Sequence, residues 1–584
     1  MSNLVLTGNS ETFSKSDKNI LAGSWCKQIQ NFEEFSKNYI TINYHWENIA
    51  KVQKDKNYLT ALYDKTLTRF SDFLNNFHGT NNSKRYWEII IGYWLANSIC
   101  TLYDRWEVIR CIFENENFEH IKILNIDENN LSVNSSEEFF REKIQSHHWN
   151  HLIFFNILKH INLNTKFEFV KAEKRIEKKS TPRKKNNFYR ILDKFLNLIP
   201  ENKKILLYQS NFVSNLDKIK IFMNTGIIFR QYPEFSPDIT QEKFVRKKMN
   251  LGLNSENNFE NFLDKFITFI MPKSFLESFN DLKTKVNFIK HDPNTIFTAY
   301  GHFYNDFFKI WMAEKMEKGK KIIILTHGGQ VEIDQTFNIQ NNIADKSIYW
   351  TRDKSFSGNT KQMPPNFLLK NKKFLKTNKN LGDKLLFLTY EVELYAHRIQ
   401  DGPLSCSVLK SYRTWEKFIE NLNEKQLEKL RVRTGYGLFR DDWQIENKFI
   451  SLLGFKKISR TRKISQDFKN SKIIIHTSMQ TTFLEAMKTG IPSIILLNKD
   501  LWNISREMKI FYQKMKLNNI IFTDPQLLNK HLNNIWDNPL KWWNNKTIIN
   551  LREEYSNLCS LEKKDNLKYW INFFKKEQLN EIRN

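Results

Sequence analysis

The sequence is poor in cysteine, which excludes two classes of site. Its 5 cysteines are spread over 584 residues, with no C-x-x-C motif and no cluster with histidine. We therefore expect neither a disulfide framework nor a zinc site. With 40% apolar and 14% aromatic residues the chain can form large cores, which excludes general disorder and a collagen-like repeat. At about 100–200 residues per domain, this length predicts several domains or two large ones.

Long hydrophobic runs are absent as well. The longest, residues 87–99, is shorter than the ~18–20 residues that are needed to cross a bilayer. Residues 1–13 lack a basic stretch followed by an apolar one, so we expect no secretory signal. These features predict a cytoplasmic protein and leave open peripheral association with the inner face of a membrane.

Common nucleotide-binding motifs are missing too. The chain has no G-x-x-x-x-G-K-[ST] phosphate loop. Gly435-Tyr436-Gly437 lacks the third glycine and the helix context of a dinucleotide-binding fingerprint.

Acidic residues are outnumbered by basic ones. The chain has 90 Lys+Arg and 64 Asp+Glu, a net charge of +26. Clustered Lys and Arg bind nucleic acid by releasing counterions, so this charge keeps a non-catalytic nucleic-acid-binding protein as an alternative. The many Lys, Ile, Asn and Phe residues also match AT-rich codon usage, and scattered lysines form no binding stripe. We therefore expect no nucleic-acid partner.

The order of apolar segments predicts an α/β protein. Runs at residues 4–7 and 19–23 end near glycine or serine and indicate buried strands, and residues 58–113 indicate long aromatic-rich helices. The run 320–325 is a buried parallel-type strand that leads into His327 and two glycines. Strands and helices alternate over residues 384–497, as in a doubly wound parallel sheet.

These segments divide the chain into three parts. We expect an N-terminal lobe over residues 1–365, with a helical insertion and a basic loop near residues 171–187. A second lobe spans residues 380–545, and helices in residues 546–584 pack back toward the first lobe.

The most informative segment is residues 473–493. A β-branched strand runs into a hydroxyl-rich turn, a helix and a Gly-Ile-Pro turn. Ligands bind at the carboxyl ends of such strands, and a helix start favours phosphate. The predicted donor-binding residues are His476, the four hydroxyl residues Thr477, Ser478, Thr481 and Thr482, which hold the phosphates, and Glu485, which is placed to bind ribose or sugar hydroxyls.

A structural explanation is open for the same helix start. In this explanation Thr481 or Thr482 is the N-cap, and Glu485 satisfies the first turn of the helix without a ligand. Thr482 and Glu485 have the spacing of a capping box.

The segment from His476 to Pro492 resembles the nucleotide-sugar-binding segment of GT-B glycosyltransferases. It is also similar to the phosphate-binding hydroxyl cluster of CDP-glycerol glycerophosphotransferases. The whole chain resembles a transferase family encoded in bacterial O-antigen and surface-carbohydrate clusters. The matching motifs share one order along the chain: residues 21–26, 102–106, 326–329, 398–403, 431–433, 476–492 and 537–543.

The resemblance implies a GT-B-like α/β fold with two Rossmann-like lobes, a deep cleft between them and helical insertions in the first lobe. It implies transfer of a sugar from a nucleotide-activated donor to a glycan or lipid-linked acceptor in surface-polysaccharide (O-antigen, lipopolysaccharide) biosynthesis. The alternatives are a polyol-phosphate transferase of the glycerophosphate type, the nucleic-acid-binding protein above, and an inactive scaffold.

His327 is the candidate catalytic base. Its imidazole has a near-neutral pKa, and Gly328 and Gly329 let a substrate approach the backbone. The resemblance to glycerophosphotransferases implies the same role, because a histidine in a His-Gly element is thought to be their base. The alternative is a histidine that is hydrogen-bonded within a turn.

Two arginines at strand ends, Arg398 and Arg433, are candidates for binding the donor, because guanidinium groups pair well with diphosphates. The alternative is that both are ordinary surface residues. Gly23 and Trp25 follow an early strand, where an indole could stack on an acceptor sugar. A core tryptophan is the alternative.

We expect no metal and no cofactor. The chain has no Asp-x-Asp pair of the kind that holds a divalent ion in GT-A enzymes. GT-B enzymes commonly use helix dipoles and basic side chains in its place.

Overall fold

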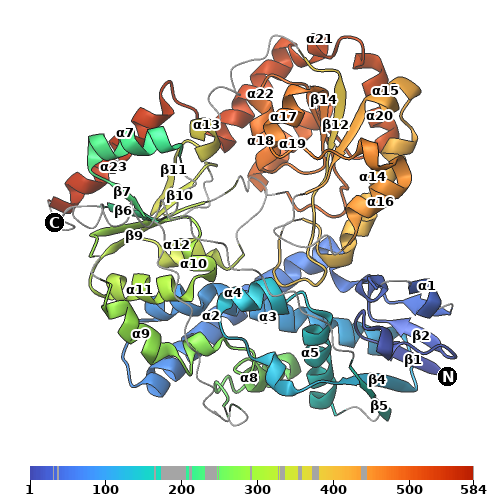
Figure 1. Ribbon diagram of the computed structural model, residues 1–584, viewed down its shortest axis with the longest axis vertical. Coiled ribbons are helices and arrows are strands. Elements are labelled where there is room, and N and C mark those ends of the chain that lie inside the picture. Colours follow the sequence, from blue (N-terminus) through green and yellow to red (C-terminus); the bar gives the residue numbers. More distant parts are fainter. Residues whose placement is uncertain are drawn as a thin grey trace.

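The computed structural model describes residues 1–582 except 30–31, 36–37, 163–165, 173–204, 209–212, 231–245, 247–248, 290–291, 327, 329–335, 353–357, 371–380, 401, 436–442 and 505. Three parallel β-sheets and the helices around them make up this part of the chain (Figure 1). The predicted α/β class is confirmed. The region expected to form one N-terminal lobe contains two separate sheets. From residue 173 onward, the predicted basic loop lies outside the described residues.

The first sheet, sheet A, is built from residues near the N-terminus. Its strand order is β3-β2-β1-β4-β5, and all neighbours are parallel. The runs at residues 4–7 and 19–23 correspond to its first two strands. The elements are β1 (Ser2–Val5), β2 (Lys18–Leu21), α1 (Phe32–Phe35), β3 (Tyr39–Thr41), β4 (His120–Asn125), α5 (His147–His160) and β5 (Lys166–Lys171).

Two long helices form a layer beside sheet A. Helix α2 (Ile49–His78) starts at Asn48, whose side chain accepts from two backbone N–H groups, and ends at Gly79 with φ 64°. Helix α3 (Lys84–Asn115) contacts α2, α5 and the helices α8 (Asn258–Phe266), α11 (Asp306–Glu317) and α12 (Ile339–Ile343). The longest apolar run of the sequence is therefore a buried helix between these neighbours. No described helix is long and apolar enough to span a membrane.

Sheet B has the order β11-β10-β9-β8-β6-β7, with parallel neighbours throughout. Its central strand β9 is the predicted strand that leads to His327. The strands are β6 (Ile205–Tyr208), β7 (Ile228–Arg230), β8 (Thr295–Thr298), β9 (Lys321–Leu325), β10 (Lys346–Tyr349) and β11 (Thr360–Gln362). The nearby helices are α4 (Ser136–Glu138), α7 (Asn215–Thr225), α9 (Phe279–Asn287), α10 (Gly301–Tyr304) and α13 (Asn366–Lys370).

Sheet C has the order β13-β12-β14-β15-β16 and is also parallel. The strands are β12 (Lys384–Leu388), β13 (Leu430–Arg433), β14 (Ser471–His476), β15 (Ser493–Leu496) and β16 (Ile521–Phe522). The helices are α14 (Val408–Glu420), α15 (Glu424–Lys429), α16 (Ile445–Leu453), α17 (Ile464–Lys469), α18 (Thr481–Met487), α19 (Arg506–Leu517), α20 (Pro525–Ile535) and α21 (Pro539–Trp543). A separate helix, α15, begins after α14 because Asn423 and Gln426 form a capping box.

The last two helices connect sheet C with sheet B. Helix α22 (Lys546–Cys559) lies against α18 and α19, whereas α23 (Asn566–Ile582) lies beside α7 (Figure 1). On α23, the indole N–H of Trp570 donates to the Pro364 carbonyl at 3.0 Å, and Glu577 pairs with Lys346 at 2.6 Å. The chain thus ends on sheet B after completing sheet C.

The segment that follows β12 is bound to the sheet A region. The Gln145 side chain exchanges two hydrogen bonds of 2.9 Å with the backbone N–H and carbonyl of Tyr395. The fully buried Arg105 donates to the Ala396 carbonyl and to Asp104. Residues that follow a strand of sheet C are therefore held by side chains from the N-terminal region.

Candidate active site

The hydroxyl-rich turn lies at the carboxyl end of β14. Thr477 is buried and donates to the Leu388 carbonyl of the neighbouring strand at 2.9 Å. Ser478 is also buried, whereas Thr481 and Thr482 are half-buried in the first turn of α18. Four predicted donor-binding hydroxyl groups thus occur within one short segment.

The start of α18 does not use the capping box. The N-cap residue is Gln480, and its side chain makes no capping hydrogen bond. Thr481 and Thr482 are the first and second residues of the helix, so neither is its N-cap, and Thr482 lies two positions beyond the N-cap that such a box requires. The structural explanation that was open for Thr482 and Glu485 is therefore wrong. Glu485 is half-buried one turn further on.

His476 is the last residue of β14 and lies beneath this turn. Its side chain is 1% exposed, and neither ring nitrogen has a hydrogen-bond partner among the described residues. Burial lowers its pKa to about 3, so the ring is neutral at pH 7 and carries one N–H donor and one acceptor. An unpaired buried polar group costs ~1–3 kcal/mol. A water or a ligand that reached His476 would remove this cost.

The loop after β9 meets the first residue of α18. The Thr326 hydroxyl donates to the Gly328 carbonyl at 3.4 Å. A Cβ atom added to Gly328 would be 3.3 Å from the Thr481 hydroxyl oxygen. Strand β9 belongs to sheet B and α18 follows a strand of sheet C, so two predicted site segments from different sheets are in contact. His327 and Gly329 lie outside the described residues, and their roles stay predictions.

Arg398 is held by a buried carboxylate. One terminal nitrogen of its guanidinium donates to Glu393 at 2.7 Å, and its Nε is buried with no hydrogen-bond partner. Burial alone would raise the pKa of Glu393, but nearby Arg398 and His397 outweigh it, so the pKa of this carboxyl lies below its ordinary value. The Arg398 side chain is 42% exposed, so its guanidinium is fixed at one end and open to a ligand at the other.

Arg433 is engaged within sheet C. Its guanidinium donates to Asp467 at 2.6 Å and to the Thr461 hydroxyl at 2.9 Å. The residue is 8% exposed. Because Asp467 already balances this charge, Arg433 has less capacity for a diphosphate than Arg398 has.

Gly23 and Trp25 lie in the core of the sheet A region. The indole is 1% exposed, donates to the Leu6 carbonyl at 3.0 Å and packs on Tyr44 and Tyr395. Its ring folds back over Gly23, where any Cβ atom would be 2.4 Å from it. A sugar would contact Trp25 only after Tyr395 had moved, so the acceptor role of this pair stays a prediction.

No motif in the sequence points to the groups around Arg398. Glu393 lies five residues earlier in an ordinary apolar stretch, and Tyr93 lies within the apolar run of α3. Tyr93 and Tyr304, whose ring centroids are 6.0 Å apart, both lie near Arg398. Residues that are more than 200 positions apart therefore share one environment, which only the fold brings together.

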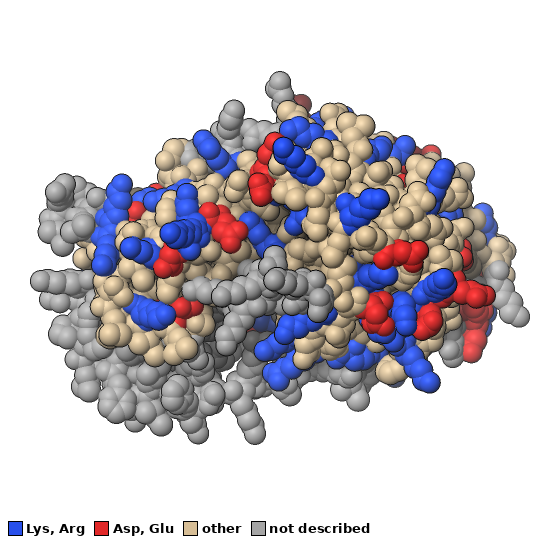
Figure 2. Space-filling model, turned by 90° about the horizontal axis from the view of Figure 1, so that it is seen from above, with Lys and Arg blue, Asp and Glu red and all other residues tan. Residues whose placement is uncertain are grey.

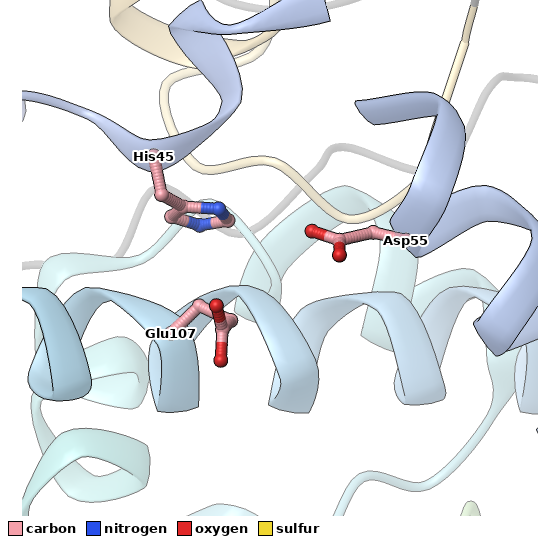
Figure 3. A group of neighbouring side chains, drawn as sticks. All are labelled: His45, Asp55 and Glu107. Carbon is pink, nitrogen blue, oxygen red and sulfur yellow. The ribbon is translucent and has the colours of Figure 1, made fainter. Parts of the chain in front are cut away.

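His45, Asp55 and Glu107 form a buried group with metal-ligand chemistry (Figure 3). Their ligand atoms lie within 4.8 Å of one another. A side-chain cation already lies there, because the Lys51 ammonium contacts Asp55 at 2.8 Å and Glu107 at 2.7 Å. Arg110 also pairs with Glu107. These contacts make the group an ion-pair network, since a metal would have to displace Lys51.

Comparisons with known proteins give one family. A family model described as "LIC12162 family transferase" matches residues 2–574. No curated protein sequence matches the chain.

Several solved structures also show a remote likeness. Acinetobacter baumannii MurG is 8% identical, with 65% of this chain and 100% of that chain covered and a TM-score of 0.32. An E. coli structure described as trehalose-6-phosphate bound with UDP-2-fluoro glucose is 10% identical (65% and 99% covered, TM-score 0.35). Anabaena Alr3699/HepE in complex with UDP and glucose is also 10% identical (65% and 99% covered, TM-score 0.34). Likenesses at these TM-scores carry no conclusion about activity.

Proposed function

This chain belongs to the LIC12162 family of transferases, and from this premise we propose that it transfers a sugar from a nucleotide-activated donor to a glycan acceptor. The observation that carries the proposal is the contact between Gly328 and Thr481. It joins the ends of two parallel strands from different sheets, and strand ends of this kind are where α/β proteins bind ligands.

The turn after β14 supplies the donor site in this proposal. The hydroxyl groups of Thr477, Ser478, Thr481 and Thr482 hydrogen-bond to the diphosphate. Glu485 accepts hydrogen bonds from ribose or sugar hydroxyls. His476 contributes the ring nitrogens that lack a partner within the protein.

Arg398 neutralises the charge that develops on the departing nucleoside diphosphate. Its unpartnered Nε and partly exposed guanidinium support this role, and Glu393 holds it in position. Arg433, on the next strand, has a smaller part in this proposal because Asp467 balances its charge. Because cationic side chains do this work, the proposed reaction is independent of a metal ion.

His327 is the proposed base. It removes the proton from an acceptor hydroxyl while that oxygen forms a bond to the anomeric carbon of the donor. The bond between that carbon and the diphosphate breaks, and the electron pair leaves with the nucleotide. Gly328 and Gly329 leave room for the acceptor beside the base.

The acceptor in this proposal is a glycan or lipid-linked saccharide of the O-antigen type, and the reaction takes place in the cytoplasm or at the inner face of the membrane. The motifs shared with transferases of surface-carbohydrate gene clusters support this assignment.

The distribution of charge favours this proposal over nucleic-acid binding. On the face shown in Figure 2, the described Lys and Arg side chains are scattered, and Asp and Glu side chains lie among them. Binding to a nucleic-acid backbone requires a connected basic surface. The net charge of +26 still attracts an anionic nucleotide donor.

A thermal-shift screen against CMP, CDP, UDP, GDP and their sugars tests the proposal. A ligand at 100 times its Kd stabilises the folded state by about 2.7 kcal/mol, so one nucleoside diphosphate should clearly raise the melting temperature. The same nucleotide should be released from its sugar at a rate that EDTA does not change.

Thr482→Val and Thr68→Val form a matched pair for this screen, because Thr68 is an exposed residue of α2. Loss of a hydrogen bond to a charged phosphate costs ~1.5–3 kcal/mol, so only Thr482→Val should weaken nucleotide binding, about tenfold or more. Stabilisation by CDP-glycerol alone would favour a polyol-phosphate transferase. No stabilisation by any nucleotide would exclude the donor site.

A further inference from the structure

A second cavity lies in the helical layer beside sheet A. Its volume is about 660 Å³, within the ~300–1,000 Å³ that is typical of small-molecule sites. Residues of α2, α3, α5 and α8 line it, and none of these helices carries a residue of the proposed transfer site. Sites built on helices are more rigid than sites built on loops.

One side of the cavity is aromatic. Tyr58, Tyr103, Trp106 and Phe259 line it, with ring centroids 5.7 Å apart for Tyr58 and Tyr103 and 5.9 Å apart for Trp106 and Phe259. Tyr58 and Trp106 are only half-buried, so part of each ring remains open. The cavity therefore offers ring faces to an occupant.

The other side of the cavity has charged residues of both signs in equal number. Asp55 and Glu107, which belong to the group in Figure 3, line the cavity together with Glu114. Lys54 and Arg110 also line it, and Lys51 pairs with Asp55 and Glu107 from behind. Three carboxylates thus oppose three cations in a chain whose net charge is +26.

We propose that this cavity binds a neutral saccharide. A sugar ring stacks its C–H face on aromatic rings, and its hydroxyl groups donate hydrogen bonds to carboxylates and amide oxygens and accept them from guanidinium and amide N–H groups. A phosphate or an ammonium ion would find no excess of opposite charge. A hydrocarbon chain would cover Lys54 and Glu114 without replacing the water that solvates them.

The site also extends the proposed function, and its role in transfer rests on that function. A sugar unit held here anchors an acceptor glycan at a second point. A second point of attachment raises the effective concentration of the acceptor at the transfer site without any new contact there.

The test uses an array of immobilised neutral oligosaccharides of hexose and N-acetylhexosamine, printed beside carboxylated, phosphorylated and amino-sugar forms. Asn258→Trp fills the cavity from an exposed position at the start of α8, so no packed side chain is lost. Asn280→Trp is the matched control, because Asn280 is exposed in the first turn of α9.

Wild-type protein and Asn280→Trp should bind at least one neutral oligosaccharide, and Asn258→Trp should bind it at least tenfold more weakly. Preferential binding of the charged glycans, no binding of a neutral one, or equal binding by Asn258→Trp would overturn the inference. The nucleotide thermal shift should be the same in all three proteins. If no nucleotide raised the melting temperature of any of the three proteins, the result would count against the transferase proposal. The array would still decide whether the cavity binds a saccharide.

Discussion

Gly328, three residues beyond the end of β9, lies against the hydroxyl of Thr481, the first residue of α18. A Cβ atom at residue 328 would be 3.3 Å from that hydroxyl oxygen, which is closer than ordinary van der Waals contact. Gly328→Val should therefore push the two loops apart or block the Thr481 hydroxyl. We expect nucleotide binding to weaken at least tenfold, measured by thermal shift.

Gly358→Val is the control for this prediction. Nothing lies within 4 Å of a Cβ atom at residue 358, so valine meets open space there. Equal nucleotide binding by the two variants would show that the contact between Gly328 and Thr481 has no part in the donor site.

The proposed base gives a second prediction. His327→Ala should lower turnover by at least ~10²-fold, the usual contribution of a general base, while the melting temperature and the nucleotide thermal shift stay unchanged. The measurement is release of nucleotide in the presence of acceptor. Turnover at the wild-type rate would remove His327 from the mechanism.

The sequence predicted local features well, because they depend on neighbouring residues. The β-branched run from Ile473 to Ile475 forms β14, and the hydroxyl-rich turn and helix follow as expected. The capping box of Thr482 and Glu485 failed by two positions, because the helix begins at Thr481 and Gln480 is the N-cap. A shift of one or two residues at a helix end is below the precision of a pattern.

Long-range features could not be predicted from the sequence, because they depend on residues that are far apart along the chain. Asp467, the partner of Arg433, lies 34 residues away, and nothing in the sequence connects the two. The separate N-terminal sheet depends on which strands pair, and apolar runs do not encode pairing. The burial of Trp25 beneath Tyr395 joins residues that are 370 positions apart, so the sequence left both a core and an acceptor role open.

Arg398 and Glu393 give a third prediction. Arg398→Lys removes the planar fork and the unpartnered Nε, so we expect turnover to fall about 10–100-fold with a smaller change in KM. Glu393→Gln should give a smaller fall in turnover, because the guanidinium stays but loses the charge that holds it.

Arg460→Lys is the matched control, since Arg460 is also about half exposed (48%) and also pairs with a glutamate, Glu446, at 2.6 Å. Its turnover should equal that of the wild type. If Arg398→Lys behaved in the same way as this variant, Arg398 would be an ordinary surface residue.

His476 predicts a pH dependence of stability. Burial lowers its pKa from 6.5 to about 3, so between these values the unfolded chain binds a proton at this residue and the folded chain does not. Stability therefore falls as the pH falls through this range. The slope of the unfolding free energy against pH reports the difference in bound protons between the unfolded and folded states. His476→Gln should reduce this difference by about one proton, as measured by urea unfolding at several pH values. An unchanged slope would mean that the folded protein protonates His476 at an ordinary pH.

Lys51 gives the last prediction, on the ion-pair network of His45, Asp55 and Glu107. The Lys51 ammonium is the cation between two carboxylates whose side chains are 5% and 8% exposed. Removing one partner of a buried ion pair costs about 3–5 kcal/mol, so Lys51→Met should lower the unfolding free energy by roughly 3 kcal/mol. Lys54→Met, three residues along the same helix at an exposed position, should change it by less than ~0.5 kcal/mol.

Mn²⁺ should then stabilise Lys51→Met, whose carboxylates lack their cation, and leave the wild type unchanged. A wild-type protein that was itself stabilised by Mn²⁺, or destabilised by EDTA, would show that a metal competes with Lys51 at this place.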